Sequence, residues 1–263
     1  GQAAALTEIG KAAHVRDALV PRSVRPFRVD VLPARIAFED AWELRPAGAG
    51  PQFALVGVGG DELTGVGPDL ARSGPAFVVA GPGRSGKSTL LAVMAESLLR
   101  LGTAVVVGAP KPSPLRGLAG RPGVLGVVTD ASAPADEWRA LLTADPDRPL
   151  VVLLDDGDVL RDCPASELFR DVLKGAAGPG RSLVLAGNAD SICTGLSGWQ
   201  VEARKSRQGV LLSPQGSTDG DLIGVRIPRS AVGQPVQAGR GLLHLGDSAL
   251  LTVAVPSAPA VPA

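Results

Sequence analysis

The stretch G-P-G-R-S-G-K-S, residues 81–88, matches the pattern G-x-x-x-x-G-K-[ST] at every fixed position. In this pattern the glycines let backbone N–H groups turn toward the α- and β-phosphates of a nucleotide, and the lysine, here Lys87, reaches the β- and γ-phosphates. The hydroxyl of Ser88 is the ligand that the pattern supplies for Mg²⁺. We therefore predict that this stretch holds a nucleoside triphosphate. The predicted binding residues are Gly81, Pro82, Gly83, Arg84, Ser85, Gly86, Lys87, Ser88 and Thr89.

The segments around this stretch fit an α/β fold. Residues 76–80 are apolar and read as a buried strand, while apolar residues recur at helical spacing between Leu90 and Leu98. The predicted helix at 86–100 therefore points its N-terminus at the phosphates. We predict further strands at 104–107, 124–128, 150–154, 182–186 and 210–212, and helices near 135–143, 165–175 and 190–198. This alternation predicts a mostly parallel sheet with helices on both faces.

The two ends of the chain have a different character. Residues 2–19 are predicted as an amphipathic helix, and residues 20–52 as an arm with one strand-like run at 29–36. Two β-hairpins are predicted, from 53–58 with 63–66 and from 242–245 with 249–255. We accordingly divide the chain into an N-terminal helix and linker arm (1–50), one α/β domain (51–256) and a disordered tail (257–263).

Composition excludes several classes of protein. Lys plus Arg equal Asp plus Glu at 26 each, which argues against a large basic surface for nucleic acid. The sequence contains no run of 18 apolar residues, so it predicts no membrane-spanning segment. Cys163 and Cys193 read as reduced thiols of a cytosolic protein. His14 and His244, the two histidines, read as incidental rather than as zinc ligands or members of a catalytic triad.

A nucleotide site of this kind needs a carboxylate across the metal, at the end of another buried strand. The apolar run at 150–154 ends in Asp155 and Asp156, so we predict that Asp155 holds Mg²⁺ and that Asp156 orients or deprotonates the attacking water. The alternatives are a simple acidic turn at this point, and Asp130, which follows a shorter apolar run with one acid.

Three further features follow the acid pair. Asn188 follows the strand at 182–186 and is predicted to sense the γ-phosphate, with an asparagine in a turn as the alternative. Arg204 and Arg207 are candidates for an arginine finger that acts on a neighbouring subunit, against the alternative of a solvated basic face. The run LSGWQ at 196–200 is interpreted as a helix end followed by a loop, because it lies after the acidic strand.

With these features together, the chain resembles FtsK/SpoIIIE-type ATPase domains, in particular the tandem domains of the EccC ATPases of type VII (ESX) secretion. The resemblance covers about residues 50–256. It rests on the hairpin that leads from residue 56 into the P-loop and on four later stretches: VVLLDDGDVL (151–160), SLVLAGNADSI (182–192), ARKSRQGVLLSP (203–214) and GRGLLHLGDSALLTVAVP (239–256).

The resemblance implies a RecA-like P-loop NTPase core of the ASCE branch, with ATP and Mg²⁺ as ligands. It also implies a cytoplasmic place within a membrane-anchored protein, neighbouring ATPase domains in series and a possible ring. FtsK-like motors have Glu where this chain has Asp156, and Gln or Thr where it has Gly187 and Asn188. These departures resemble the later EccC domains, which hold ATP statically and offer a pocket to a secretion signal.

We therefore expect a C-terminal ATPase module that binds ATP tightly, hydrolyses it slowly and works with a secreted protein substrate or a neighbouring domain. Two alternatives stay open. A DNA translocase motor would need a basic pore and fast turnover in a ring. A degenerate docking module would use bound ATP as structural glue without hydrolysis.

Overall fold

The structure is a computed structural model that describes residues 31–246 and 248–259. The described residues from Leu32 onward belong to one compact unit. The helix predicted at 2–19 lies outside the described residues.

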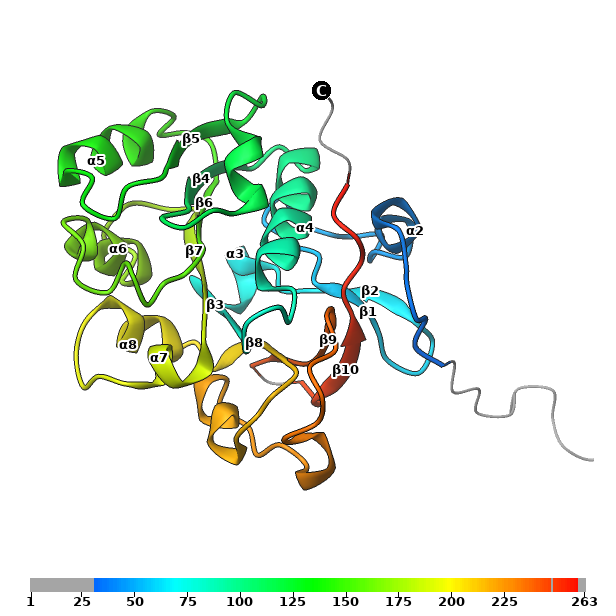
Figure 1. The fold of residues 1–263 in the computed structure, drawn as a ribbon. Coiled ribbons are helices and arrows are strands. Elements are labelled where there is room, and N and C mark those ends of the chain that lie inside the picture. The colour runs from blue at the N-terminus through cyan, green and yellow to red at the C-terminus, as the bar shows by residue number, and fades with distance from the viewer. Residues whose placement is uncertain (1–30, 247, 260–263) are drawn as a thin grey trace, which may run out of the picture. The chain divides into compact units, whose positions relative to one another are not determined.

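A ten-stranded, mostly parallel sheet forms the centre of this unit, with the strand order β2-β1-β10-β9-β8-β3-β7-β6-β4-β5 (Figure 1). The strands from β8 to β5 run parallel, while β9, β10, β1 and β2 extend the sheet in antiparallel fashion. The strands are β1 (Gly57–Gly59), β2 (Thr64–Val66), β3 (Ala76–Ala80), β4 (Ala104–Gly108), β5 (Val124–Val128), β6 (Leu150–Leu154), β7 (Arg181–Gly187), β8 (Gln208–Leu212), β9 (Arg240–Leu245) and β10 (Leu251–Ala254).

Helices cover both faces of the sheet, as Figure 1 shows. One face carries α4 (Lys87–Arg100), whose apolar side packs on alternate residues of the central strands together with Leu115 of the 3₁₀ helix η1 (Pro114–Leu118). The other face carries α5 (Ala135–Thr143), α6 (Ser166–Leu173) and α8 (Trp199–Arg204). Because both faces are covered, the central strands β3, β4 and β6 are apolar throughout rather than alternating.

Three aromatic rings join the helices of the second face. Phe169 of α6 lies edge-on between Trp138 of α5, at a centroid distance of 4.9 Å, and Trp199 of α8, at 5.2 Å. All three side chains are buried. Edge-to-face pairs of this kind stabilise a fold beyond the area that they bury. They fix α8 against the sheet, close to the turn that follows β6.

Smaller elements surround the sheet. The arm at 32–37 leads into α2 (Phe38–Glu43), whose Phe38 and Trp42 pack on the first hairpin. The remaining elements are α3 (Leu70–Ser73), α7 (Ala189–Cys193) and the 3₁₀ helices η2 (Ser217–Leu222) and η3 (Arg229–Ala231). At the C-terminal side the backbone N–H of Ser257 donates to the carbonyl of Ile36, at 3.0 Å. No helix in the described ranges is long and apolar enough to cross a membrane.

The predicted fold class and both hairpins are confirmed, and three local predictions are wrong. The described part of the strand-like run at 29–36 forms no strand. Of the helix predicted at 190–198, only residues 190–193 are helical, as part of α7, while residues 194–198 form a loop and α8 begins at Trp199. The run LSGWQ is therefore a loop followed by a helix start. Gly198, at φ 106°, takes a conformation that interrupts a helix and that favours glycine.

Candidate nucleotide-binding site

The P-loop connects β3 to α4 at the carboxyl edge of the parallel strands. Its turn closes at Gly86, which has a φ of 101° in the left-handed region and precedes the first residue of α4, Lys87. A side chain at Gly86 would be strained by this φ and would also approach the backbone N of Gly239 to 3.1 Å. The segment before β9 stabilises the loop, because the N–H of Gly239 donates to the carbonyl of Ser85 at 2.9 Å. Because α4 begins at Lys87, its first N–H groups have no partner within the helix and are available to phosphate oxygens.

Lys87 folds back over the loop that carries it. Its Nζ donates to the carbonyls of Gly81 and Pro82, at 2.9 and 2.8 Å, and to Oδ1 of Asn188, at 3.4 Å. Burial lowers the pKa of Lys87, although the nearby carboxylates of Asp155, Asp156 and Asp158 act in the opposite direction. A partly buried ammonium is stabilised by nearby negative charge, which phosphate oxygens would supply.

The two predicted acids occupy different environments. Asp155 is 1 % exposed, and its carboxylate accepts hydrogen bonds from the hydroxyl of Ser113, at 2.8 Å, and from the N–H of Asp156, at 3.1 Å. Asp156 is partly exposed, with a φ of 50°. Its Oδ1 lies 3.3 Å from Nζ of Lys111, which also lies 3.6 Å from Asp158. Burial opposes the charged form of Lys111, but these two carboxylates outweigh it and raise the pKa of Lys111.

One cavity of about 460 Å³ brings the predicted site residues together. The P-loop, the acid pair after β6 and Asn188 after β7 all contribute to its wall. Of the predicted residues, those that line it are Gly83, Arg84, Gly86, Lys87, Ser88, Thr89, Asp155, Asp156 and Asn188. Pro82 lines a smaller cavity that shares Gly83 and Asn188 with this one, and Ser85 is fully buried.

Strand order explains this convergence. The P-loop strand β3 pairs with β7, and β7 pairs with the acidic strand β6, so one strand separates the two phosphate-site motifs. Parallel strands end at the same edge of a sheet, and ligands of open α/β sheets bind there. Asn188 therefore lies between Lys87 and the acid pair. Asp130, the alternative acid, follows β5 at the sheet margin and caps its own turn by accepting from Ser132.

The donor set fits a magnesium nucleotide. The buried hydroxyl oxygen of Ser85 has no hydrogen-bond partner among the described residues, which leaves a polar atom under the loop. A hydroxyl, Ser88, and a buried carboxylate, Asp155, line one cavity, and both are hard oxygen ligands of the kind that Mg²⁺ takes. No group of three or more His, Cys, Asp or Glu side chains gathers as a metal site in the described part of the chain.

The structure places the two candidate arginines away from the cavity. Arg204 donates to the carbonyls of Cys193 and Gly195, at 2.7 and 3.2 Å, so it closes the loop between α7 and α8. Arg207 lines a different hollow, with Arg226 and Arg229. His244 is buried with its ring against the carbonyls of Arg207 and Ile223, and His14 lies outside the described residues.

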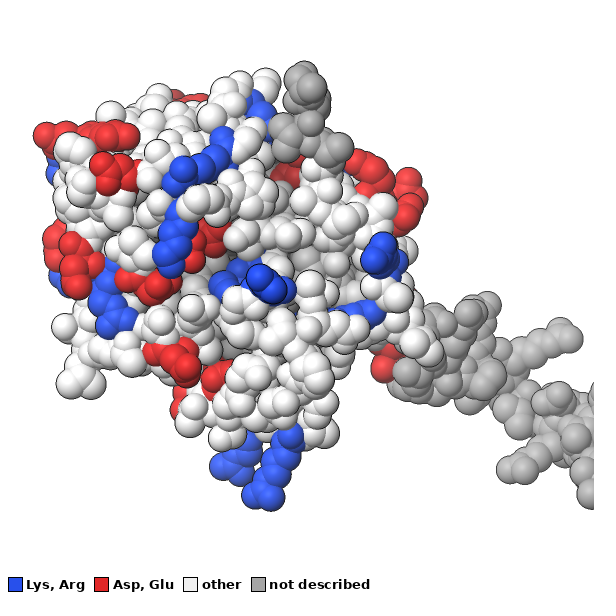
Figure 2. Space-filling model, in the orientation of Figure 1, with Lys and Arg blue, Asp and Glu red and all other residues white. Residues whose placement is uncertain are grey.

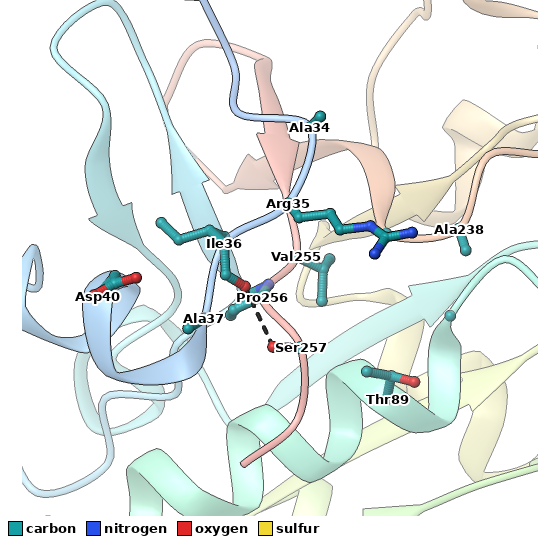
Figure 3. A pocket seen from close by; sticks show the side chains of 12 residues that line it. Ala34, Arg35, Ile36, Ala37, Asp40, Thr89, Ala238, Val255, Pro256 and Ser257 are labelled. Atoms are coloured by element: carbon teal, nitrogen blue, oxygen red, sulfur yellow. Dashed lines mark hydrogen bonds between the residues drawn. The ribbon is translucent and has the colours of Figure 1, made fainter. Parts of the chain in front are cut away.

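Sequence reasoning missed two parts of the site. Lys111 and Ser113, in the loop after β4, contact the acid pair. A second cavity of about 700 Å³ shares Gly86, Thr89 and Ala238 with the phosphate cavity. Its other walls come from both ends of the described chain: Ala34, Arg35, Ile36, Ala37, Asp40, Gly239, Val255, Pro256 and Ser257 (Figure 3). Residues 34–37 and 255–257 contain no motif that would identify a binding site from the sequence.

No protein-family model matches the sequence, and no curated protein matches it. Solved structures do match. EssC from Geobacillus thermodenitrificans, a structure of its ATPases 2 and 3, is 19% identical, with a TM-score of 0.70 over 95% of this chain and 49% of that one. The fold is that of the EssC and EccC ATPase domains.

Two other neighbours support the same fold. Thermomonospora curvata EccC (ATPases 2 and 3), in complex with a signal sequence peptide, has 19% identity and a TM-score of 0.68, covering 88% of this chain and 45% of that one. The pCW3 conjugation coupling protein TcpA, with ATPγS, has 16% identity and a TM-score of 0.56, covering 88% and 72%. The chain spans about half the length of the EssC and EccC structures. The RecA-like P-loop ATPase fold is thereby confirmed.

Proposed function

We propose that this chain is an ATP-binding domain that takes Mg-ATP at the P-loop and hydrolyses it slowly. The observation that carries the proposal is the cavity of about 460 Å³, in which residues of the P-loop meet Asp155, Asp156 and Asn188. These groups come from three separate strand ends, and together they form the donor set of a phosphoryl-transfer site.

The P-loop side chains and backbone would hold the triphosphate. Lys87 would exchange its bonds to the carbonyls of Gly81 and Pro82 for phosphate oxygens, which satisfy an ammonium better than neutral acceptors do. Ser88 and Asp155 are the residues that would hold magnesium. When bound, Mg²⁺ would neutralise charge on the phosphate oxygens. Asp156 would orient the attacking water, and Asn188 would contact the γ-phosphate.

The second cavity is suited to the base and ribose. It continues from the phosphate cavity past Thr89 and has a mostly apolar lining from the arm and from residues 255–257. Figure 3 shows the side chain of Arg35 extending across it toward Ala238. A guanidinium in this place can stack on a purine ring. The 3.4 Å hydrogen bond from the hydroxyl of Ser257 to the carbonyl of Ile36 ties the two walls together.

Slow hydrolysis follows from what surrounds the acid pair. Asp156 is one methylene shorter than the Glu of FtsK-like motors, so its carboxylate reaches less far toward the attacking water. In the described part of the chain, Arg84 is the one arginine that lines the phosphate cavity. Because Arg204 and Arg207 lie elsewhere, fast turnover would need a cation from a neighbouring domain, which can be worth several orders of magnitude in rate.

The partners that we propose are neighbouring ATPase domains and a protein substrate, within a cytoplasmic part of a membrane-anchored, type VII-like system. The supporting likeness is to EssC and EccC, the latter seen with a signal sequence peptide. DNA is the less favoured substrate. The net charge is zero, and Figure 2 shows acidic and basic side chains interspersed over the face drawn, without a continuous basic groove.

Titration of the chain with a fluorescent ATP analogue, with and without Mg²⁺, tests the proposal. We expect binding that Mg²⁺ strengthens and that unlabelled ATP competes away. An ATPase assay with and without duplex DNA is the second arm, and we expect slow turnover that DNA does not stimulate. Absence of ATP binding would refute the site, while strong stimulation by DNA would favour a translocase. Binding without any turnover would favour the docking module.

A further inference from the structure

The loop that follows β4 contacts both members of the acid pair, which lie more than 40 positions further along the chain. Strand β4 pairs in parallel with β6, with Gly108 opposite Leu154. The two strands therefore end side by side, and the next residues of each chain segment meet. The hydroxyl of Ser113 donates to Oδ2 of Asp155 at 2.8 Å, across a separation of 42 residues. Nζ of Lys111 lies 3.3 Å from Oδ1 of Asp156.

This loop is held in place by its own contacts. The guanidinium of Arg116 donates to the carbonyl of Ala109, at 3.0 and 2.9 Å, and to that of Pro110, at 3.0 Å. Leu115, fully buried, anchors η1 in the core beside α4. Prolines at 110, 112 and 114 restrict the backbone further. Little conformational entropy thus remains to be lost when the loop orients another group.

Ser113 has a fixed orientation within this loop. Its oxygen accepts from the N–H of Leu115 at 3.3 Å, as the cap of η1, which directs the hydroxyl hydrogen toward Asp155. Both oxygens of Asp155 are then engaged, Oδ2 by Ser113 and Oδ1 by the N–H of Asp156. Asp155 is thus a buried carboxylate with a hydrogen bond at each oxygen, and these bonds fix its orientation.

Lys111 acts on the other acid. Its ammonium bridges Asp156 and Asp158 at 3.3 and 3.6 Å. Asp156 has a positive φ, which is uncommon for a residue with a side chain and must be maintained by its surroundings. Lys111 is half-exposed, so its ion pair contributes little to the stability of the fold, and its main effect is to orient the carboxylate of Asp156.

We propose that Ser113 and Lys111 are positioning residues: Ser113 orients Asp155 toward the magnesium of the bound nucleotide, and Lys111 holds Asp156 toward the water that attacks the γ-phosphate. The proposal rests on the proposed ATP site. It assigns the loop after β4 to that site, alongside the P-loop and the strand ends of β6 and β7. Outer partners of metal ligands are worth about 10–100-fold in metal affinity, which sets the size of the expected effect.

The test for Ser113 is the ratio of ATP affinities measured with Mg²⁺ and with EDTA. For Ser113→Ala we expect this ratio to fall about tenfold, with the affinity in EDTA unchanged. Ser113→Thr should keep the parent's ratio, since it keeps the hydroxyl and Ser113 has extended backbone angles that Thr adopts. Ser132→Ala is the control, because it also removes a bond from a serine hydroxyl to an aspartate, here Asp130 after β5, two strands from β6.

The outcomes separate this inference from the function on which it rests. A parent chain that binds no ATP with or without Mg²⁺ refutes the ATP site itself. A parent that binds Mg-ATP, with a Ser113→Ala ratio within twofold of it, overturns the role of Ser113 and leaves the function intact. An equal loss in Ser132→Ala would also overturn it, because the effect would then not belong to Asp155.

Lys111 is tested by binding of ADP with aluminium fluoride and Mg²⁺, which mimics the transferred group with its attacking water. We expect the parent to bind this combination more tightly than ADP, Lys111→Met to lose most of that gain and Lys111→Arg to keep it. Affinity for ATP should stay constant in all three. Lys205→Met, which removes an exposed pair with Glu202, is the control. The role of Lys111 is overturned if Lys111→Met binds ADP with aluminium fluoride as much more tightly than ADP as the parent does. It is also overturned if the parent itself shows no such preference.

Discussion

Glu96 offers a sharp test of how the P-loop helix is held. This carboxylate lies in α4 and is 6 % exposed. One oxygen accepts from Nε of Arg100 at 2.8 Å and the other from Nη2 of Arg121 at 2.7 Å. Glu96→Gln keeps the shape but replaces one accepting oxygen by an NH₂ group that faces an arginine. Hydrogen bonds to charged groups contribute about 1.5–3 kcal/mol each, so losing one and weakening the other should cost about 2–3 kcal/mol.

For a domain of this size that loss corresponds to a fall in Tm of roughly 5–10 °C. Burial opposes ionisation of Glu96, but hydrogen bonds and positive charge from Arg100 and Arg121 outweigh it and hold the pKa of Glu96 below its usual value. The stabilisation is therefore present above the unfolded carboxyl's pKa of about 4.3 and is lost as the pH falls through the lower folded pKa. The difference between parent and variant should shrink below about pH 4.

Urea unfolding of parent and Glu96→Gln, at pH 7 and at steps down to the acid limit of folding, measures both quantities. Glu39→Gln is the matched control, because Glu39 pairs with the same Arg100 at 2.5 Å but has a side chain that is 64% exposed. Solvent screens that pair, so its loss should matter less. Two results would refute this role of Glu96. One is a loss of unfolding free energy at pH 7 that is no larger for Glu96→Gln than for Glu39→Gln. The other is a loss for Glu96→Gln that stays constant as the pH falls below about 4.

The remaining predictions concern the nucleotide site. Lys87→Ala should weaken ATP binding about hundredfold in a fluorescence titration while the unfolding midpoint without ATP changes little; parent-like affinity would contradict the P-loop reading. Arg35→Ala should weaken binding of ATP about fivefold but leave competition by tripolyphosphate unchanged, and an equal loss for both would place Arg35 at the phosphates. Asp156→Asn should lower single-turnover hydrolysis at least about hundredfold at constant ATP affinity, and unchanged hydrolysis would exclude its catalytic role. Duplex DNA should bind weakly and with steep salt dependence in an anisotropy assay; sub-micromolar binding at physiological salt would revive translocation.

The sequence alone determined the parts of the site that are local in the chain. The P-loop is a contiguous turn whose shape follows from its own residues, with Gly86 in the left-handed region and a helix starting at Lys87. The acid pair was recognisable for the same reason, because Asp155 and Asp156 directly follow a fully buried strand. Apolar runs of about five residues identified the central strands to within one or two residues.

Tertiary structure decided which of these parts meet. That β7 lies between β3 and β6, and that β4 lies beside β6, is set by how helices pack across the sheet, and no local pattern encodes it. The contact of Ser113 with Asp155 follows from that order. The cavity beside Thr89 is built from residues 34–37 and 255–257, which are brought together by antiparallel strands at the far end of the sheet. Such contacts depend on the summed packing of the whole core, so the sequence supplied the chemical groups and the fold supplied their neighbours.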